Sequence, residues 1–481
     1  MRTNLTLLTD FYEITMANGY LEHGIGDKIA YFDMYFRQIP DGGGYAIMAG
    51  VEQVVSYLKN LRFTKDDIAF LRSKGCFSEA FLEYLADFKF VCDVWAIEEG
   101  TPIFPNEPLI VVRGPIIQAQ LIETMILLTI NHQSLIATKA NRIVRAADGR
   151  SVIEFGSRRA QGYDGAIYGA RAAFIGGCVG TACTIAEKKF KIPAMGTMAH
   201  SWVQLFPDEY SAFCAYASVY SDSCTLLVDT YNVLKSGVPN AIRVHREVLE
   251  PMGKRLKGIR IDSGDITYLS KKARKMLDEA GLADCKITAS NALDEYIIRE
   301  TIMQGAKVDA FGVGERLITS RSEPVFGGVY KLVAVESNGG IIPKIKLSEN
   351  VSKITNPGFK NLFRLFTKDG KAFADVITLH DEVIDETRPY TIFHPEHTWK
   401  KSILKEFTVE PLLKRIFDKG KCVYKLPSLA EIQKTCREKV GRLWDEVLRF
   451  ENPHEYYVDL SKPLWDLKQK LLREHNQANT E

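Results

Sequence analysis

The chain has 481 residues, and its 62 Lys and Arg against 60 Asp and Glu leave a formal net charge of +2 at pH 7. At about 100 to 200 residues per domain, this length predicts two or three domains with an ample core. A composition with 46% hydrophobic and 25% charged residues is that of a globular protein and excludes a largely disordered chain. The near-neutral charge gives no basis for a nucleic-acid or membrane-surface partner.

The cysteines and the termini indicate the compartment. The nine cysteines form neither a C-x-x-C motif nor a Cys/His cluster with zinc spacing, so we expect free thiols and no structural metal. The N-terminus, with Asp10 and Glu13, lacks the apolar core of a signal peptide. The most apolar long stretch, 125–130, ends well short of the roughly 20 residues that a membrane span requires. We therefore predict a cytoplasmic protein without a membrane partner.

Residues 1–130 mix helix and strand patterns. The stretch 31–36 alternates like a strand and leads into the glycines of 42–44, which permit positive φ. Thr64, with Asp67 three residues later, predicts a capping box that opens a short helix. An amphipathic helix is expected over about 121–147. We interpret this region as an N-terminal α/β domain.

The middle of the chain, 131–335, has a regular rhythm of short apolar runs. Helical patterns, such as 269–277 and 293–302, lie between the runs, so strand and helix alternate. Six such units favour a parallel α/β barrel over an open parallel sheet. The runs predicted as strands are 152–156, 194–200, 226–230, 259–262, 287–291 and 310–314.

The rhythm stops after about residue 336. Charged, Pro-containing segments follow, with helical patterns at 429–450 and 464–472. We therefore expect three parts: 1–130, a barrel with the active site over 131–335, and a smaller C-terminal region, 336–481, packing on the first part.

In a parallel barrel or sheet, ligands bind beyond the carboxyl ends of the strands. Arg158 and Arg159 follow the first run, and two guanidiniums there suit a carboxylate or phosphate, although surface ion pairs are the alternative. His200 ends the second run; a single histidine at such a place is more often a structural hydrogen-bonding residue than a catalyst.

Two further strand ends contain binding chemistry. Arg260, Asp262 and Asp265 surround a glycine, a set that suits a sugar's hydroxyls together with a Mg²⁺-phosphate, although Asp265 also fits a helix cap. Gly312 and Gly314 lack the full dinucleotide-binding fingerprint and fit a small anion cradle of backbone N–H groups better.

Several motifs, taken in order, together resemble the nicotinate phosphoribosyltransferase family. The resemblance runs from the first ten residues to about residue 360. The motifs lie at 7–12, 36–37 with 42–44, 155–162, 196–201, 259–265, 290–291 and 327–332.

This resemblance implies an irregular parallel α/β barrel of the type II phosphoribosyltransferase kind. It implies the reaction of nicotinate with 5-phosphoribosyl 1-diphosphate to nicotinate mononucleotide and diphosphate, the first step of NAD biosynthesis from nicotinate. It also implies Mg²⁺, coupled hydrolysis of ATP through a phosphorylated histidine, and a homodimer with composite active sites.

The family pattern also implies roles for particular residues. His200 matches the phosphohistidine, and Asp262 is the second catalytic residue. Phe155 and Tyr12 of the partner subunit would enclose the pyridine ring. The remaining nicotinate-binding residues implied are Arg158, Arg159, Thr197 and Arg260, and the phosphoribosyl- and phosphate-binding residues are Asp265, Ser290, Asn291, Gly312, Gly314, Glu315 and Thr319.

Glu315 departs from the family pattern, in which many relatives have Thr at this position. Because a carboxylate cannot donate to a phosphate, either Mg²⁺ mediates the contact or Thr319 and backbone amides replace it. Mg²⁺ itself is expected to bind mainly through the substrate phosphates.

Four alternative functions remain open. A nicotinamide phosphoribosyltransferase would share the fold, but Arg158 and Arg159 suit the carboxylate of nicotinate better than a neutral amide. A quinolinate phosphoribosyltransferase would be shorter and would use no phosphohistidine. A metal-dependent barrel enzyme would use His200, Asp262 and Asp265 as ligands, and a non-enzymatic binding protein would show no turnover.

Overall fold

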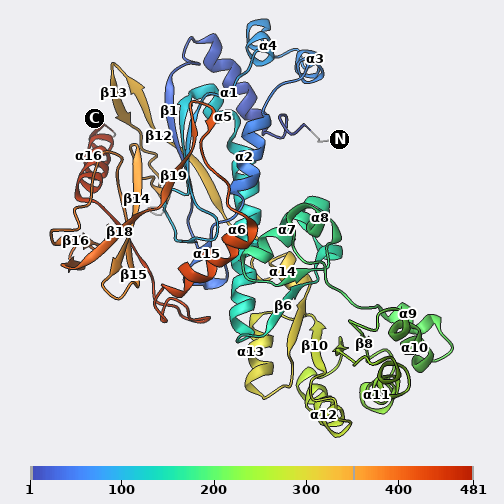
Figure 1. The fold of residues 1–481 in the computed structure, drawn as a ribbon. Coiled ribbons are helices and arrows are strands. Elements are labelled where there is room, and N and C mark those ends of the chain that lie inside the picture. The colour runs from blue at the N-terminus through green and yellow to red at the C-terminus, as the bar shows by residue number, and fades with distance from the viewer. Residues whose placement is uncertain (1–3, 350–352, 479–481) are drawn as a thin grey trace. The chain divides into compact units, whose positions relative to one another are not determined.

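The computed structural model describes residues 4–349 and 353–478. Contacts divide the chain into a central unit, Ile136–Pro324, and a terminal unit formed by Met1–Leu135 with Val325–Glu481. Figure 1 shows the central unit in teal to yellow and the terminal unit in blue, cyan, orange and red. No helix within the described ranges has both the length and the hydropathy needed to cross a bilayer.

The central unit is built on a six-stranded sheet with the order β7-β6-β11-β10-β9-β8, in which all pairings are parallel. Strand β6, the first of the six in sequence, lies between β7, the second, and β11, the last. This is the order of a barrel, because the first and last strands of a barrel are neighbours. No pairing of β7 with β8 is recorded in the described residues, so the ring is incomplete there. The predicted irregular parallel α/β barrel is confirmed. The strands are β6 (Ser151–Glu154), β7 (Gly180–Thr181), β8 (Thr225–Leu227), β9 (Gly258–Ile261), β10 (Lys286–Asn291) and β11 (Ala310–Val313).

Helices return the chain between these strands. In α12, the Asp265 side chain caps the first turn and Ala273 and Leu277 are buried, because apolar residues recur on one face. The predicted helices over 269–277 and 293–302 are therefore confirmed as α12 and α13. The helices are α7 (Gly162–Ile175), α8 (Thr184–Phe190), α9 (His200–Leu205), α10 (Glu209–Val219), α11 (Val238–Val244), α12 (Ile266–Glu279), α13 (Glu295–Met303) and α14 (Glu315–Ile318).

The strand predicted over 194–200 is wrong. Ala194 makes an isolated parallel bridge with Thr181, and His200 already begins α9. Between them, the carbonyl oxygen of Met198 accepts a hydrogen bond at 3.1 Å from the Arg260 guanidinium. Its partner is therefore a side chain and not the backbone of a neighbouring strand. The strand that takes this place, β7, has two residues, too few for an apolar pattern.

The terminal unit contains a seven-stranded sheet with the order β13-β12-β1-β5-β3-β19-β20. The predicted strand 31–36 is confirmed as β1, which pairs antiparallel with β5 and β12. Its residues are buried on both faces, and the rings of Phe32 and Tyr330 stack at 4.8 Å. The strands are β1 (Ile29–Phe36), β3 (Asp93–Ile97), β5 (Ile110–Pro115), β12 (Gly328–Ser337), β13 (Gly340–Pro343), β19 (Leu413–Asp418) and β20 (Lys421–Cys422).

Six α-helices lie within the described residues 4–146. The predicted capping box is confirmed, since Thr64 and Asp67 each accept from the other's backbone N–H at the start of α3. The long predicted helix is also confirmed, as α6. The helices are α1 (Phe11–Glu22), α2 (Val51–Asn60), α3 (Lys65–Ser73), α4 (Glu79–Ala86), α5 (Ile116–Leu121) and α6 (Glu123–Ala146).

The C-terminal part of the chain contains more strands than its sequence suggests. The helix predicted over 429–450 is too long, because α15 ends at Gly441 and turns follow. The second predicted helix is confirmed as α16. This part contains a sheet with the order β18-β14-β15-β21 and a two-stranded hairpin. Its elements are β14 (Lys360–Thr367), β15 (Ala372–Leu379), β16 (Tyr390–Phe393), β17 (Lys401–Leu404), β18 (Phe407–Pro411), α15 (Leu429–Gly441), β21 (Tyr457–Leu460) and α16 (Lys462–Ala478).

Candidate active site

Most of the predicted site residues lie at the carboxyl ends of the parallel strands of the central unit. Because these ends meet at one edge of the sheet, residues far apart in sequence become neighbours. Asp262 follows β9, Ser290 and Asn291 end β10, and Gly312 and Gly314 lie at the end of β11.

Arg260 fixes the segment that leads to His200. Its guanidinium donates to Thr197 Oγ1 at 2.7 Å and to the carbonyl oxygen of Met198 at 3.1 Å. Burial lowers the pKa of this guanidinium, and the nearby charge of Arg158 acts in the same direction. The Nε atom of Arg260 is buried without a partner in the described structure. Arg260 thus ties β9 to the backbone just before α9.

His200 is the first residue of α9 and is partly open to solvent. Its Nδ1 lies 3.1 Å from Thr230 Oγ1, and its Nε2 lies 3.8 Å from Asp262 Oδ2. The side chains of His200 and Asp262 are 40% and 38% exposed. One imidazole nitrogen is therefore held by a hydroxyl, while the other faces a carboxylate in an accessible position.

The carboxylates beside His200 form a network with two serines. Asp229 Oδ2 accepts from the backbone N–H of Asp262 at 3.0 Å and from Ser263 Oγ at 2.6 Å. Ser290 Oγ donates to Asp262 Oδ1. The other carboxylate oxygen of Asp229, Oδ1, is buried without a partner in the described structure. These contacts fix the orientation of Asp262 toward His200.

Phe155 and the glycines of β11 form the next part of the edge. An ideal Cβ on Gly312 would lie 2.4 Å from Phe155 Cδ2 and 3.3 Å from Ser290 Cβ, so a larger residue would displace the ring. The backbone N–H of Phe155 donates to the Val313 carbonyl at 2.8 Å. Gly314 is the N-cap residue of α14. Phe155 is thus packed on β11, next to the Asp262 network.

The two arginines after β6 lie in the turn η2 (Ser157–Arg159) and are exposed. Arg159 Nε is 4.0 Å from Glu315 Oε2, and Arg321 donates to Glu315 Oε1 at 3.2 Å. Thr319 Oγ1 donates to the backbone carbonyl of Glu315 at 2.8 Å. Glu315 is therefore held by two guanidiniums, and the hydroxyl proton of Thr319 is already engaged.

Three predicted residues have other surroundings. Asp265 accepts from the Tyr268 N–H at 2.8 Å as the cap of α12. Asn291 Oδ1 accepts from the Ala292 N–H at 2.7 Å. Tyr12 belongs to α1 of the terminal unit, where burial and the Glu123 carboxylate raise the pKa of its hydroxyl.

The sequence places Asp229 among the polar residues at the strand ends but assigns no role to it or to Thr230, although they orient Asp262 and His200. Their signal was present, since they follow the apolar run 226–228 just as the other site residues follow theirs. No group of three His, Cys, Asp or Glu side chains in the described ranges is arranged to hold a metal ion.

Comparison with known proteins identifies the family. Three models together match most of the chain: the nicotinate phosphoribosyltransferase N-terminal domain at 7–131, the nicotinate phosphoribosyltransferase family at 151–358 and the C-terminal domain at 359–468. The nicotinate phosphoribosyltransferase of Bacillus subtilis is 44% identical over 98% of this chain and 96% of its own. The chain belongs to the nicotinate phosphoribosyltransferase family.

Solved structures agree with this assignment. The crystal structure of human nicotinic acid phosphoribosyltransferase superposes with a TM-score of 0.86 and 31% identity, covering 96% of this chain and 99% of the human chain. Nicotinate-nucleotide pyrophosphorylase from Pyrococcus furiosus has a TM-score of 0.70 and 25% identity over 91% of this chain and 96% of its own. The chain is therefore an enzyme of the nicotinate phosphoribosyltransferase family with the type II fold.

Proposed function

We propose that this member of the nicotinate phosphoribosyltransferase family joins nicotinate to 5-phosphoribosyl 1-diphosphate and couples the step to ATP through a phosphorylated His200. The single observation that supports the coupling is the accessible imidazole of His200, held between Thr230 Oγ1 and Asp262 Oδ2. A neutral imidazole nitrogen is a competent phosphoryl acceptor. Phosphorylation would add close to two negative charges beside Arg260 and Arg158, which would favour reordering of the loops around them.

The strand-end residues supply the groups that the transfer needs. Diphosphate leaves while positive charge develops on the sugar, so catalysis rests on neutralising the leaving group and positioning the pyridine nitrogen. Phe155 would support the pyridine ring, and Arg158 and Arg159 would bind its carboxylate. Asp262 would hold the ribose hydroxyls, and the backbone N–H groups after Gly312 and Gly314 would hold the phosphate.

Mg²⁺ fits this site as an ion bound mainly through substrate phosphates. Asp229 Oδ1 is a buried carboxylate oxygen without a partner in the described structure, and Asp262 lies next to it. Carboxylate oxygens are the ligands that Mg²⁺ prefers, so these two residues would hold it. When bound, it would neutralise charge on the diphosphate.

The deciding experiment measures nicotinate mononucleotide with and without ATP, with nicotinamide as the competing substrate. We expect stimulation by ATP and a higher kcat/KM for nicotinate, because paired guanidiniums favour a carboxylate over a neutral amide. Equal kcat/KM for the two substrates would contradict the assignment of Arg158 and Arg159.

Composite sites in a homodimer are part of this proposal. Tyr12 belongs to the terminal unit and Asp262 to the central unit, and we propose that they meet across a dimer interface. Mixing inactive Tyr12→Ala and Asp262→Ala subunits should then regenerate one intact site per heterodimer. Verified heterodimers that remain inactive would indicate that each site is built within one subunit.

A further inference from the structure

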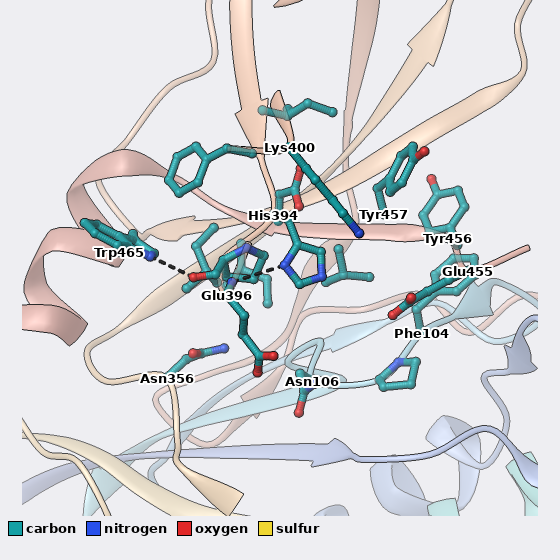
Figure 2. A pocket seen from close by; sticks show the side chains of 18 of the residues that line it. Phe104, Asn106, Asn356, His394, Glu396, Lys400, Glu455, Tyr456, Tyr457 and Trp465 are labelled. Atoms are coloured by element: carbon teal, nitrogen blue, oxygen red, sulfur yellow. Dashed lines mark hydrogen bonds between the residues drawn. The ribbon is translucent and has the colours of Figure 1, made fainter. Parts of the chain in front are cut away.

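A cavity of about 1120 Å³ opens in the terminal unit beside the β16–β17 hairpin and α16 (Figure 2). All of its lining residues belong to the terminal unit, and none is among the residues that we assign to phosphoribosyl transfer. Its size is slightly above the range of about 300 to 1,000 Å³ that is usual for small-molecule sites. The cavity is therefore a candidate for a second binding function.

The loop 394–400 forms one wall, and its geometry is fixed by its own hydrogen bonds. His394 Nδ1 accepts from the backbone N–H groups of Glu396 at 3.1 Å and His397 at 3.0 Å. Because Nδ1 is an acceptor, the ring proton is on Nε2, which can donate to a ligand. Trp465 Nε1 donates to the Pro395 carbonyl at 2.9 Å and ties the loop to α16. Burial lowers the pKa of His394, so the neutral ring is favoured.

Two donors reach the same part of the cavity. Figure 2 shows the Lys400 side chain extending toward the ring of His394. The Lys400 ammonium has no hydrogen bond or ion pair in the described parts of the chain, so its charge is available. Deeper in the lining, Lys468 Nζ donates to Asn356 Oδ1 at 2.8 Å, and burial lowers the pKa of this amine to about 8.

Acceptors and an apolar wall complete the lining. The carboxylates of Glu396 and Glu455 and the amide of Asn106 line the part of the cavity below His394 in Figure 2, and neither carboxylate has a recorded ion pair within 4–349 and 353–478. Asp459 also lines the cavity at 4% exposure, and burial raises the pKa of its carboxyl to about 7. The stacked rings of Phe104 and Tyr456, 3.9 Å apart, form an apolar surface beside them.

We propose that this cavity binds a phosphorylated sugar, either free or as part of a nucleotide. An ammonium and an imidazole N–H directed at one place suit a phosphoryl group. Carboxylates and an amide facing them suit sugar hydroxyls, which donate. In this arrangement the phosphoryl group contacts Lys400 and His394, and the hydroxyls contact Glu396, Glu455 and Asn106.

The tryptophans of the chain can serve as spectroscopic probes of binding. It has five tryptophans, of which Trp465 lines the cavity and Trp202 lies two residues after His200. Full-length enzyme labelled with 5-fluorotryptophan, its signals assigned with Trp465→Phe and Trp202→Phe, is titrated in fluorine NMR. The four probes are ribose 5-phosphate, adenosine 5′-monophosphate, ribose and inorganic phosphate.

We expect ribose 5-phosphate or adenosine 5′-monophosphate to move the Trp465 signal saturably, and ribose and phosphate alone to do so at least about tenfold more weakly. A preference between the first two separates a free sugar phosphate from a nucleotide. The double variant His394→Gln/Lys400→Gln should weaken the Trp465 response at least about tenfold. It should keep the Trp202 signal and the catalytic rate. Lys405→Gln, an exposed lysine outside the lining, is the matched control.

A second variant separates this site from the catalytic one. Asp262→Ala should leave the Trp465 response intact even if the proposed function of Asp262 proves wrong. Loss of the Trp465 response in Asp262→Ala, an unmoved Trp465 signal in the wild type, or an undiminished response in His394→Gln/Lys400→Gln would each overturn the proposal.

Discussion

Charged side chains in the two units meet very different surroundings. In the sheet of β14 and β15, Arg364 and Asp375 are 3% and 0% exposed and form a bidentate ion pair at 2.8 and 2.6 Å. In the candidate active site of the central unit, His200 and Asp262 are 40% and 38% exposed, and Nε2 of the imidazole lies 3.8 Å from Oδ2 of the carboxylate. Buried charges must be fully paired, whereas a site that receives a charged substrate must leave part of its pairing open. The difference separates charges that hold the fold from charges that do the chemistry.

The largest effect is expected from breaking the buried ion pair of Arg364 and Asp375. Arg364→Leu would leave Asp375 as an uncompensated buried charge beside the buried carboxyl of Glu107, so we expect a loss of about 3 to 5 kcal/mol in the free energy of unfolding. Urea denaturation measures it. Arg72→Leu, which removes the exposed pair with Glu79, is the control and should unfold as the wild type does. A wild-type midpoint for Arg364→Leu would contradict the structural role.

The next effect is a pH dependence in the same unit. Burial raises the pKa of Asp459 from 3.8 to about 7. A raised pKa means that the protonated carboxyl adds stability below pH 3.8, and that this contribution is lost as the pH rises to about 7. Relative to Asp459→Asn, the wild type should therefore lose about 2 to 4 kcal/mol between pH 4 and pH 8. A difference between the wild type and Asp459→Asn that stays flat from pH 4 to pH 8 would refute the burial argument.

Arg159 tests the role of the exposed charges in the central unit. Arg159→Ala should raise the KM for nicotinate by about 10 to 100-fold, because a charge-assisted contact contributes roughly 1.5 to 3 kcal/mol. Steady-state kinetics with nicotinate and nicotinamide separates the two substrates. Arg246→Ala, an exposed arginine elsewhere in the central unit, should change neither KM. If Arg159→Ala weakened both substrates equally, the guanidinium would not recognise the carboxylate.

The smallest effect concerns the hydroxyl that holds His200. Thr230→Val keeps the shape and removes the partner of Nδ1, so the ATP-stimulated rate should fall by about 3 to 10-fold. Thr230→Ser should restore it. Thr230→Val should leave the slow ATP-independent transfer unchanged, since a purely structural role for Thr230 would lower both rates.

The sequence predicted the elements whose signals are local. The capping box of Thr64 and Asp67 and the strands at whose carboxyl ends Asp262 and Ser290 lie depend on neighbouring residues, and the structure has them. The apolar run at 194–200 led to a wrong strand prediction, because the guanidinium of Arg260, more than sixty residues later, donates a hydrogen bond to the backbone of this run. Periodicity contains no information about such a partner.

The C-terminal strands were missed for a related reason. In β14, Lys360 and Arg364 look like residues of an exposed segment, yet both are buried because Asp33 and Asp375 neutralise them. The partner of Lys360 is more than three hundred residues away in the chain. Likewise, the orientation of His200 by Thr230 follows from the meeting of the start of α9 with the segment after β8, which only the fold reveals.

The central claim is that His200 accepts a phosphoryl group from ATP, and labelling with γ-labelled ATP tests it most directly. The wild type should acquire acid-labile label on one histidine per chain, and His23→Asn, an exposed histidine of the terminal unit, should acquire it equally. His200→Asn should fold, stay unlabelled and lose stimulation by ATP while keeping a slow ATP-independent transfer, because charge neutralisation and positioning do not pass through the imidazole. Label retained on folded His200→Asn, or undiminished stimulation by ATP, would show that another residue accepts the phosphoryl group.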